Sequence, residues 1–149
     1  MIFFKYFALV TTCFIISGCP YKETYKYQGQ PIVQKEIEVL PQTVYFKKWK
    51  NEANCTIGFK IINGTDNVKR FNFQRSYLLT LTDTIQIQNV VFELGKLENT
   101  KEDIMVPPNS DTLVGLYFHG NADQFKGDIN LIFSSSGIED MVIKYKKVR

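Results

Sequence analysis

From about residue 42 to the end of the chain, apolar and polar residues alternate in short runs. Residues 55–62 carry three alternating apolar side chains, Ile57, Phe59 and Ile61, and residues 128–134 repeat the pattern. Alternation with a period of two is typical of a β-strand with one buried face. No window of this region shows the i, i+3, i+4, i+7 apolar spacing of an amphipathic helix. The pattern therefore predicts an all-β domain.

Turn residues separate the alternating runs. Asn63-Gly64 lies between two of them and predicts a tight hairpin, because both residue types tolerate a positive φ. Near Asn89 the phase of the apolar residues slips, which indicates a bulge or a turn. About seven to nine short strands, spaced roughly 8–12 residues apart, predict an antiparallel two-sheet sandwich over residues 42–149. Twelve Phe and eight Tyr supply bulky side chains for its core.

The N-terminal residues follow another pattern, a single apolar run. Residues 6–16 are almost wholly apolar, the one charge before them is Lys5, and two small residues follow. These are the parts of a secretory signal peptide. The run is shorter than the roughly 20 apolar residues that a transmembrane helix needs.

The run ends in Ile16, Ser17, Gly18 and Cys19, which resemble, position for position, the lipobox of bacterial lipoproteins. The resemblance implies that the Cys19 thiol takes a diacylglycerol. It also implies cleavage after Gly18 and acylation of the new N-terminus, with palmitate as a typical acyl group. Several acyl chains hold a protein stably at a membrane, since each buried CH₂ contributes about 0.8 kcal/mol. The expected location is the cell envelope, and the outer membrane if the source has two membranes.

The expected organisation is a helical signal segment at 1–18, a lipidated Cys19 with a flexible tether at 19–41, and the sandwich at 42–149. As an alternative, residues 32–33 or 37–39 of this segment add a strand at the edge of the sandwich. The formal charge of the whole chain is +3, and Lys5 is the one charged residue before Cys19. A chain so close to neutral, without a basic face, is not expected to bind nucleic acid.

Three features in the order of the chain resemble the immunoglobulin-like domains of bacterial envelope lipoproteins. They are the Ile61-Ile62-Asn63-Gly64 turn, a strand that ends at Asp83, and a Pro-Pro-Asn-Ser-Asp loop before an apolar strand at residues 112–119. The resemblance covers residues 57–133. It implies an adhesion, interaction or structural module, and fold alone does not specify which.

Catalytic residues and metal ligands are not expected. After cleavage, Cys55 is the one thiol besides Cys19, so the domain has no internal disulfide. Its apolar surroundings predict a small buried side chain. The single histidine, His119, ends an apolar strand, and no cysteine or histidine spacing typical of a metal site occurs. No catalytic, cofactor or metal site is predicted.

Two short motifs suggest modification. Asp83-Thr84-Ile85 and Asp111-Thr112-Leu113 resemble the Asp-Ser/Thr-apolar acceptor of O-glycosylation in the Bacteroidetes, which makes Thr84 and Thr112 candidate sites. Two Asn-x-Thr sequons also occur, at Asn54 and Asn63.

Two functions remain open at this stage. The first is a non-enzymatic interaction or structural module that binds a protein partner in the envelope through a sheet face or an edge strand. The alternative is a small-molecule or glycan binder with a pocket near Trp49 and Tyr117. Trp49 lies among lysines, and either caps the core or stands exposed to stack on a ligand.

Overall fold

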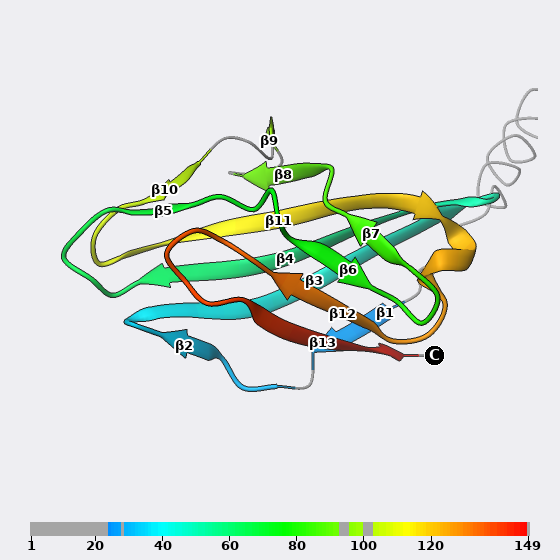
Figure 1. The fold of residues 1–149 in the computed structure, drawn as a ribbon, viewed down its shortest axis with the longest axis horizontal. Helices are drawn as coiled ribbons and strands as arrows, with labels where there is room; N and C mark the ends of the chain where they lie inside the picture. The colour runs from blue at the N-terminus through cyan, green and yellow to red at the C-terminus, as the bar shows by residue number, and fades with distance from the viewer. Residues whose placement is uncertain (1–23, 28, 93–95, 100–102, 149) are drawn as a thin grey trace, which may run out of the picture.

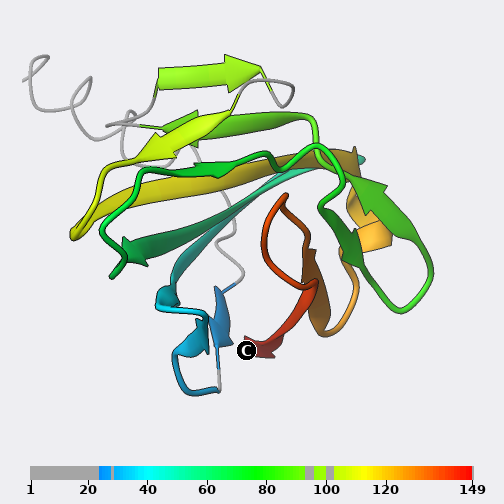
Figure 2. The ribbon, with the colours of Figure 1, turned by 60° about the vertical axis from the view of Figure 1, so that its left-hand side comes forward.

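The computed structural model describes residues 24–27, 29–92, 96–99 and 103–148. Over these residues the chain forms thirteen β-strands and one short 3₁₀ helix, with antiparallel pairing throughout. Two sheets lie as separate layers, which Figure 2 shows from the side. The predicted all-β antiparallel sandwich is confirmed.

The larger sheet has six strands in the order β2-β3-β4-β11-β8-β9 (Figure 1). Its three central strands are long, with 13, 12 and 12 residues, and run side by side along most of the molecule. The strands are β2 (Ile32–Gln34), β3 (Ile37–Trp49), β4 (Glu52–Asn63), β11 (Ser110–Asn121), β8 (Asn89–Phe92) and β9 (Lys96–Asn99).

The second sheet has five strands in the order β1-β13-β12-β6-β7. A separate two-stranded ribbon pairs β10 with β5, and the 3₁₀ helix η1 connects the two sheets after β11. The strands are β1 (Thr24–Tyr27), β13 (Met141–Val148), β12 (Ile129–Phe133), β6 (Tyr77–Leu79), β7 (Thr84–Gln86), β10 (Ile104–Val106) and β5 (Lys69–Phe71), and η1 spans Ala122–Phe125.

The core fills the space between the two layers with aromatic rings. Phe59 of β4 and Phe133 of β12 meet edge to face, with ring centroids 5.2 Å apart, and Phe73 contacts Phe133 in the same way at 5.3 Å. At the other end, Phe46 and Phe125 repeat the geometry at 5.3 Å. Edge-to-face pairs of this kind contribute about 0.5–1.5 kcal/mol beyond burial of their area. Rings contributed by both sheets therefore hold the layers together.

The sandwich begins earlier than residue 42. The segment expected as a tether contains β1, β2 and the first part of β3. β1 forms an edge strand of the five-stranded sheet, and β2 forms an edge strand of the six-stranded sheet. The reason is burial: Tyr25, Ile37 and Val39 point into the core, and the Tyr25 hydroxyl donates to the Phe125 carbonyl at 2.9 Å. Residues 32–33 and 37–39 thus follow the alternative of joining the sheet.

The hairpin predicted at Asn63-Gly64 is wrong. β5 pairs with β10 instead of β4, and Gly64 does not adopt a positive φ. The Asn63 side chain is fully buried and organises a wide turn, since its amide donates to the carbonyls of Val106 and Pro107 at 3.1 and 2.9 Å. The slip expected near Asn89 is the point where the chain leaves β7 in one sheet for β8 in the other.

Candidate functional site

The lipobox residues Ile16, Ser17, Gly18 and Cys19 lie outside the described residues, so lipidation stays a prediction. Among the residues that the structure describes, no helix has the length and apolar character needed to cross a membrane.

Cys55 and His119 lie on opposite sides of the larger sheet. Cys55 pairs with Phe118 on the core side, whereas His119 pairs with Asn54 on the solvent side. Burial raises the pKa of the Cys55 thiol to about 12, so the thiolate does not form at neutral pH. The His119 Nδ1 atom instead contacts the Asn54 Oδ1 atom at 2.6 Å. The geometry gives this thiol neither a base nor access for a substrate.

Tyr145 lies in the core near Cys55 and carries another titratable group. Its ring is buried, and its hydroxyl has no hydrogen-bond partner among the described residues. Burial is the main cause that raises its pKa above the ordinary value, and the neighbouring Cys55 and Tyr27 add to the shift. Within the described ranges, no three His, Cys, Asp or Glu side chains converge as a metal site requires.

The two candidate glycosylation sites differ in accessibility. Thr84 is exposed at the start of the edge strand β7, and its N–H donates to the Asp83 carboxylate at 2.8 Å. Thr112 lies on β11 opposite Ile61, on the side of the strand that faces the core, and is half-buried. Of the two, Thr84 has the access that a glycosyltransferase needs. The sequon at Asn63 is closed by burial of that side chain.

The solvent-facing side of the six-stranded sheet, called the outer face below, carries exposed apolar side chains. Trp49 is 66% exposed, Tyr45 61% and Leu113 61%. Each apolar side chain left in water forgoes roughly 1.5–3 kcal/mol of burial. The strand register places eight apolar side chains on the outer face: Val33, Leu40, Tyr45, Trp49, Ile62, Val91, Leu113 and Tyr117.

The side chains of the outer face stand in rows across the strands. Tyr45 and Tyr117 flank Thr56 in one row, because both pair with it from neighbouring strands. In the next row toward the middle, Gly58 and Gly115 pair with each other. Gly115 is buried, because the Thr56 and Val91 side chains pack beside it.

Trp49 is exposed, as one of the two interpretations of its sequence context required. It shares the outer face with Tyr117 but lies in a different row, opposite Glu52. Neither residue lines either of the two hollows described next.

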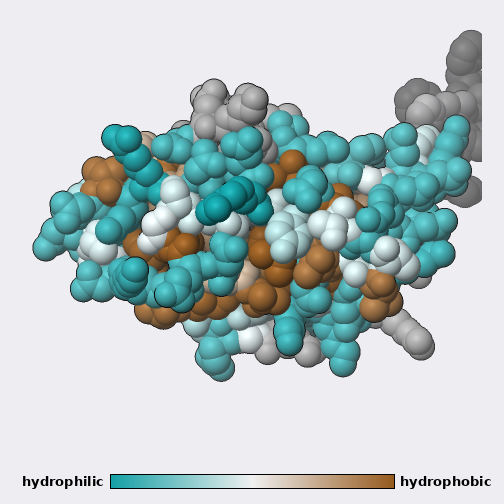
Figure 3. All heavy atoms as spheres, in the orientation of Figure 1, coloured by the Kyte–Doolittle hydropathy of each residue, from teal (hydrophilic) through white to brown (hydrophobic). Residues whose placement is uncertain are grey.

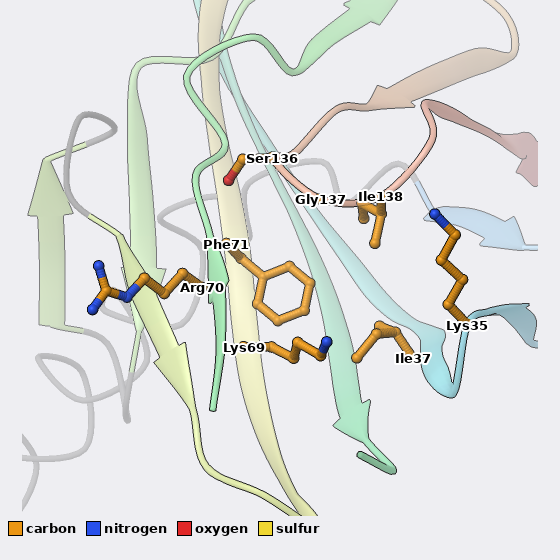
Figure 4. Close-up of a pocket in the computed structure, with 8 residues that line it drawn as sticks. All are labelled: Lys35, Ile37, Lys69, Arg70, Phe71, Ser136, Gly137 and Ile138. Atoms are coloured by element: carbon orange, nitrogen blue, oxygen red, sulfur yellow. The ribbon is translucent and has the colours of Figure 1, made fainter. Parts of the chain in front are cut away.

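Two hollows lie elsewhere on the molecule. One, of about 670 Å³, is a mixed-charge groove beside β12 and β13 with Tyr27 and Asp128 on its walls. Figure 3 shows the side that carries the five-stranded sheet, where apolar surface reaches the exterior between hydrophilic side chains. The other hollow, called the end cavity below, has a volume of about 310 Å³. Its walls are Lys35, Ile37, Lys69, Arg70, Phe71, Ser136, Gly137 and Ile138 (Figure 4).

The end cavity was not predicted from the sequence. Its residues come from the β2–β3 turn, from β5 and from the β12–β13 connection, which lie far apart along the chain. The N–H of Glu139 donates to the Gln34 side-chain oxygen at 3.0 Å and fixes two of these segments together. No local motif carries such a site, because only the sheet topology assembles it.

The fold has relatives among solved structures. An uncharacterised β-sandwich protein from Clostridium difficile 630 is 14% identical with a TM-score of 0.55, covering 85% of this chain and 99% of the other. A functionally unknown protein from Listeria monocytogenes EGD-e is 10% identical with a TM-score of 0.60, covering 86% of each chain.

A third structure comes from Bacillus subtilis and is described as that of a "putative lipoprotein". It is 10% identical with a TM-score of 0.50, and the match covers 85% of this chain but 38% of the other. No protein-family model matches the chain, and no curated protein matches it either. At these identities the comparisons establish the β-sandwich fold and nothing finer.

Proposed function

We propose that this chain is a lipid-anchored protein of a bacterial cell envelope, and that its sandwich binds a protein partner through the outer face without catalysing a reaction. The anchor rests on the lipobox at residues 16–19. The fold shared with the Bacillus subtilis protein is consistent with it. In an envelope of two membranes, the outer membrane is the proposed location.

The exposure of large apolar side chains on the outer face carries the binding proposal. Contiguous apolar patches on a protein surface commonly mark protein-interaction sites. Aromatic residues such as Tyr45 and Trp49 are enriched in the centres of such interfaces. The charges on this face include the Lys60–Asp111 ion pair, which is satisfied within the chain. The three long central strands offer a broad surface, which suits a protein partner better than an enclosed small ligand.

The anchor is tested with the full-length protein in growing bacteria. Labelling with an alkyne analogue of palmitate should mark the wild type and leave Cys19→Ala unlabelled and incompletely processed. Cys13→Ala, which changes the other cysteine of the same segment, is the matched control and should label normally. Equal labelling of the Cys19→Ala protein would refute the anchor.

The binding face is tested by photo-crosslinking in cells. A benzophenone amino acid replaces Leu113 on the outer face or, as control, Val142 on the five-stranded sheet, which is 55% exposed. The two positions are similarly accessible but belong to different faces. One discrete adduct from position 113 and none from position 142 supports the proposal. Identical band patterns from both positions, or no adduct from position 113, contradicts it.

A further inference from the structure

The end cavity combines an apolar floor with cationic walls. Ile37 and Phe71 form the floor and are almost fully buried, and Ile138 packs beside them. No acidic residue is among the eight that line it, whereas three are basic. An apolar floor attracts hydrocarbon and the ammonium groups attract an anion. The two requirements together describe a ligand with an apolar group and a negative charge.

Figure 4 separates the roles of the three basic residues. The Lys69 side chain runs beside the Phe71 ring toward Ile37, and the Lys35 ammonium extends toward Ile138 from another segment, whereas the Arg70 guanidinium extends away from the cavity. Lys69 is half-buried next to the apolar floor. Among the described residues, none of the three forms an ion pair with a carboxylate. Within the described part of the chain, the two ammonium groups at the cavity therefore have no carboxylate partner.

The turn that presents Lys35 is strained. Lys35 and Glu36 have φ values of 47° and 66°, in the left-handed region that glycine and asparagine prefer. Non-glycine residues in this region cost of order 1 kcal/mol each, and such strain clusters at functional sites. The Glu36 carbonyl accepts from the Gly64 N–H at 2.8 Å, which holds the turn in place. The strained turn keeps the Lys35 side chain at the edge of the cavity.

The volume limits the size of the ligand. At about 310 Å³, the cavity is at the lower end of the range of roughly 300–1,000 Å³ for small-molecule sites. It has room for one large apolar side chain and a carboxylate. We propose that the end cavity binds a carboxylate that carries one large apolar group. This chemistry occurs both in a free acyl-amino acid and at the C-terminus of a peptide that ends in an apolar residue.

The end cavity is separate from the outer face, to which a protein partner is proposed to bind. The end cavity lies between the β2–β3 turn, β5 and the β12–β13 connection, and none of the apolar side chains of the outer face lines it. Failure of the crosslinking experiment at Leu113 would leave this cavity untouched, and the converse also holds.

The test is an NMR titration of residues 20–149, which contain every described strand of the sandwich and its closed core. The probes are N-acetyl-phenylalanine and its neutral amide, which have the same apolar group and similar size but differ in the charge of the terminal group. The acid should shift the backbone amides of residues 35–37, 69–71 and 136–138, with a Kd of order 0.1–1 mM for a ligand of this size. The amide should bind at least about tenfold more weakly.

Charge variants at the cavity give the second measurement. Lys69→Gln and Lys35→Gln should each weaken binding of the acid about tenfold, and Lys69→Arg should restore most of the affinity. Arg70→Gln removes the same charge from a side chain that points away, and should change the affinity less than about twofold. Unshifted amides elsewhere in the spectrum would show that each variant is folded.

The source of the carboxylate is separated by a further probe, the hexapeptide Gly-Ser-Gly-Ser-Gly-Phe with a free carboxylate. Tighter binding of the hexapeptide than of N-acetyl-phenylalanine supports a peptide C-terminus, and equal binding supports a free acid. Three results would overturn the proposal: equal binding of acid and amide, an equal loss with Arg70→Gln and Lys69→Gln, or no shift at the cavity up to about 10 mM acid.

Discussion

The two faces of β4 belong to one strand but differ in burial and in what packs against them. Cys55, Ile57, Phe59 and Ile61 point inward and are fully buried, and their neighbours along the strand point outward. The inner face is closed by rings from the opposite sheet, such as Phe133. The outer face carries apolar side chains that no described element of this chain covers. The difference indicates that the inner face supplies stability, whereas the outer face is the surface on which the proposed binding of a partner would depend.

The largest effect should come from truncating one apolar residue on each face. Phe59→Ala empties the contact with Phe133 and should lower the free energy of unfolding by about 3–5 kcal/mol. Leu113→Ala, on the outer face, should change it by no more than about 0.5 kcal/mol. Urea denaturation followed by circular dichroism measures both. A loss at Leu113 comparable to that at Phe59 would mean that the outer face belongs to the core.

The buried Asn63 side chain tests whether the inner face accepts a polar group only when the hydrogen bonds of that group are formed. The Asn63 amide shares its two hydrogens among the carbonyls of Val106, Pro107 and Asn67, the last at 2.8 Å, and its side-chain oxygen accepts from the Thr65 hydroxyl at 2.8 Å. Asn63→Ala leaves several backbone groups without partners, so it should cost about 2–3 kcal/mol. Asn54→Ala, on the outer face of the same strand, loses one side-chain contact among the described residues, the one with His119, and is the matched control.

The control decides what the Asn63 result means. Asn54→Ala should cost less than about 1 kcal/mol in the same denaturation experiment. If the two substitutions lower the free energy of unfolding equally, the hydrogen bonds around Asn63 contribute no more than the ordinary loss of one side chain.

High pH should lower the free energy of unfolding through two titratable groups that are buried in the core. The pKa of Cys55 rises from 9.0 to about 12 on folding, and that of Tyr145 also rises above its ordinary value. Above pH 9 the unfolded chain therefore loses a proton that the folded chain keeps, so stability is complete below pH 9 and falls as pH rises toward 12. The slope is at most about 1.4 kcal/mol per pH unit for each group.

Two substitutions isolate this effect. Cys55→Val and Tyr145→Phe each remove one titrating group and keep an apolar side chain of similar size, and the Tyr145 hydroxyl has no hydrogen-bond partner in the described residues. Denaturation at pH 8 and at pH 10.5 should show a smaller decline for each variant than for the wild type. An unchanged decline would place the alkaline sensitivity elsewhere in the molecule.

The inner face is also the part of the fold that the sequence predicts well. Alternation at residues 55–62 and 128–134 marks β4 and β12, because a half-buried strand needs apolar residues at every second position. Turn chemistry was a poorer guide. Asn63-Gly64 has the preferred hairpin sequence and makes no hairpin, whereas Lys35-Glu36 makes a two-residue turn with two positive φ values and no glycine. Long-range pairing outweighed local preference at both positions.

The candidate sites were less predictable than the fold, for a related reason. Exposure of Trp49 could be weighed but not decided from its lysine neighbours, since the direction of a strand-end residue depends on the register with β4. The end cavity joins Lys35, Lys69 and Ser136 from three separated segments. Only the pairing of the strands brings these residues together, and one sequence alone does not encode that pairing in a local motif.

The smallest expected effect concerns a position that belongs to neither face of the sheet. Glu36→Gly relieves the positive φ of 66° in the β2–β3 turn. Because glycine also gains freedom in the unfolded chain, the net stabilisation should be about 0.5–1 kcal/mol. Lys50→Gly, at a φ of 54° in the turn between β3 and β4, relieves similar strain far from the end cavity. Both variants should unfold at higher urea concentration than the wild type.

Binding then separates the two turns. If the strained turn positions Lys35, the looser Glu36→Gly variant should bind N-acetyl-phenylalanine about two- to threefold more weakly, because the ammonium must be ordered again on binding. Lys50→Gly should bind it like the wild type. Equal affinities for both variants, with both stabilised, would mean that the strain at Lys35 and Glu36 is only a cost of connecting two strands by the shortest turn.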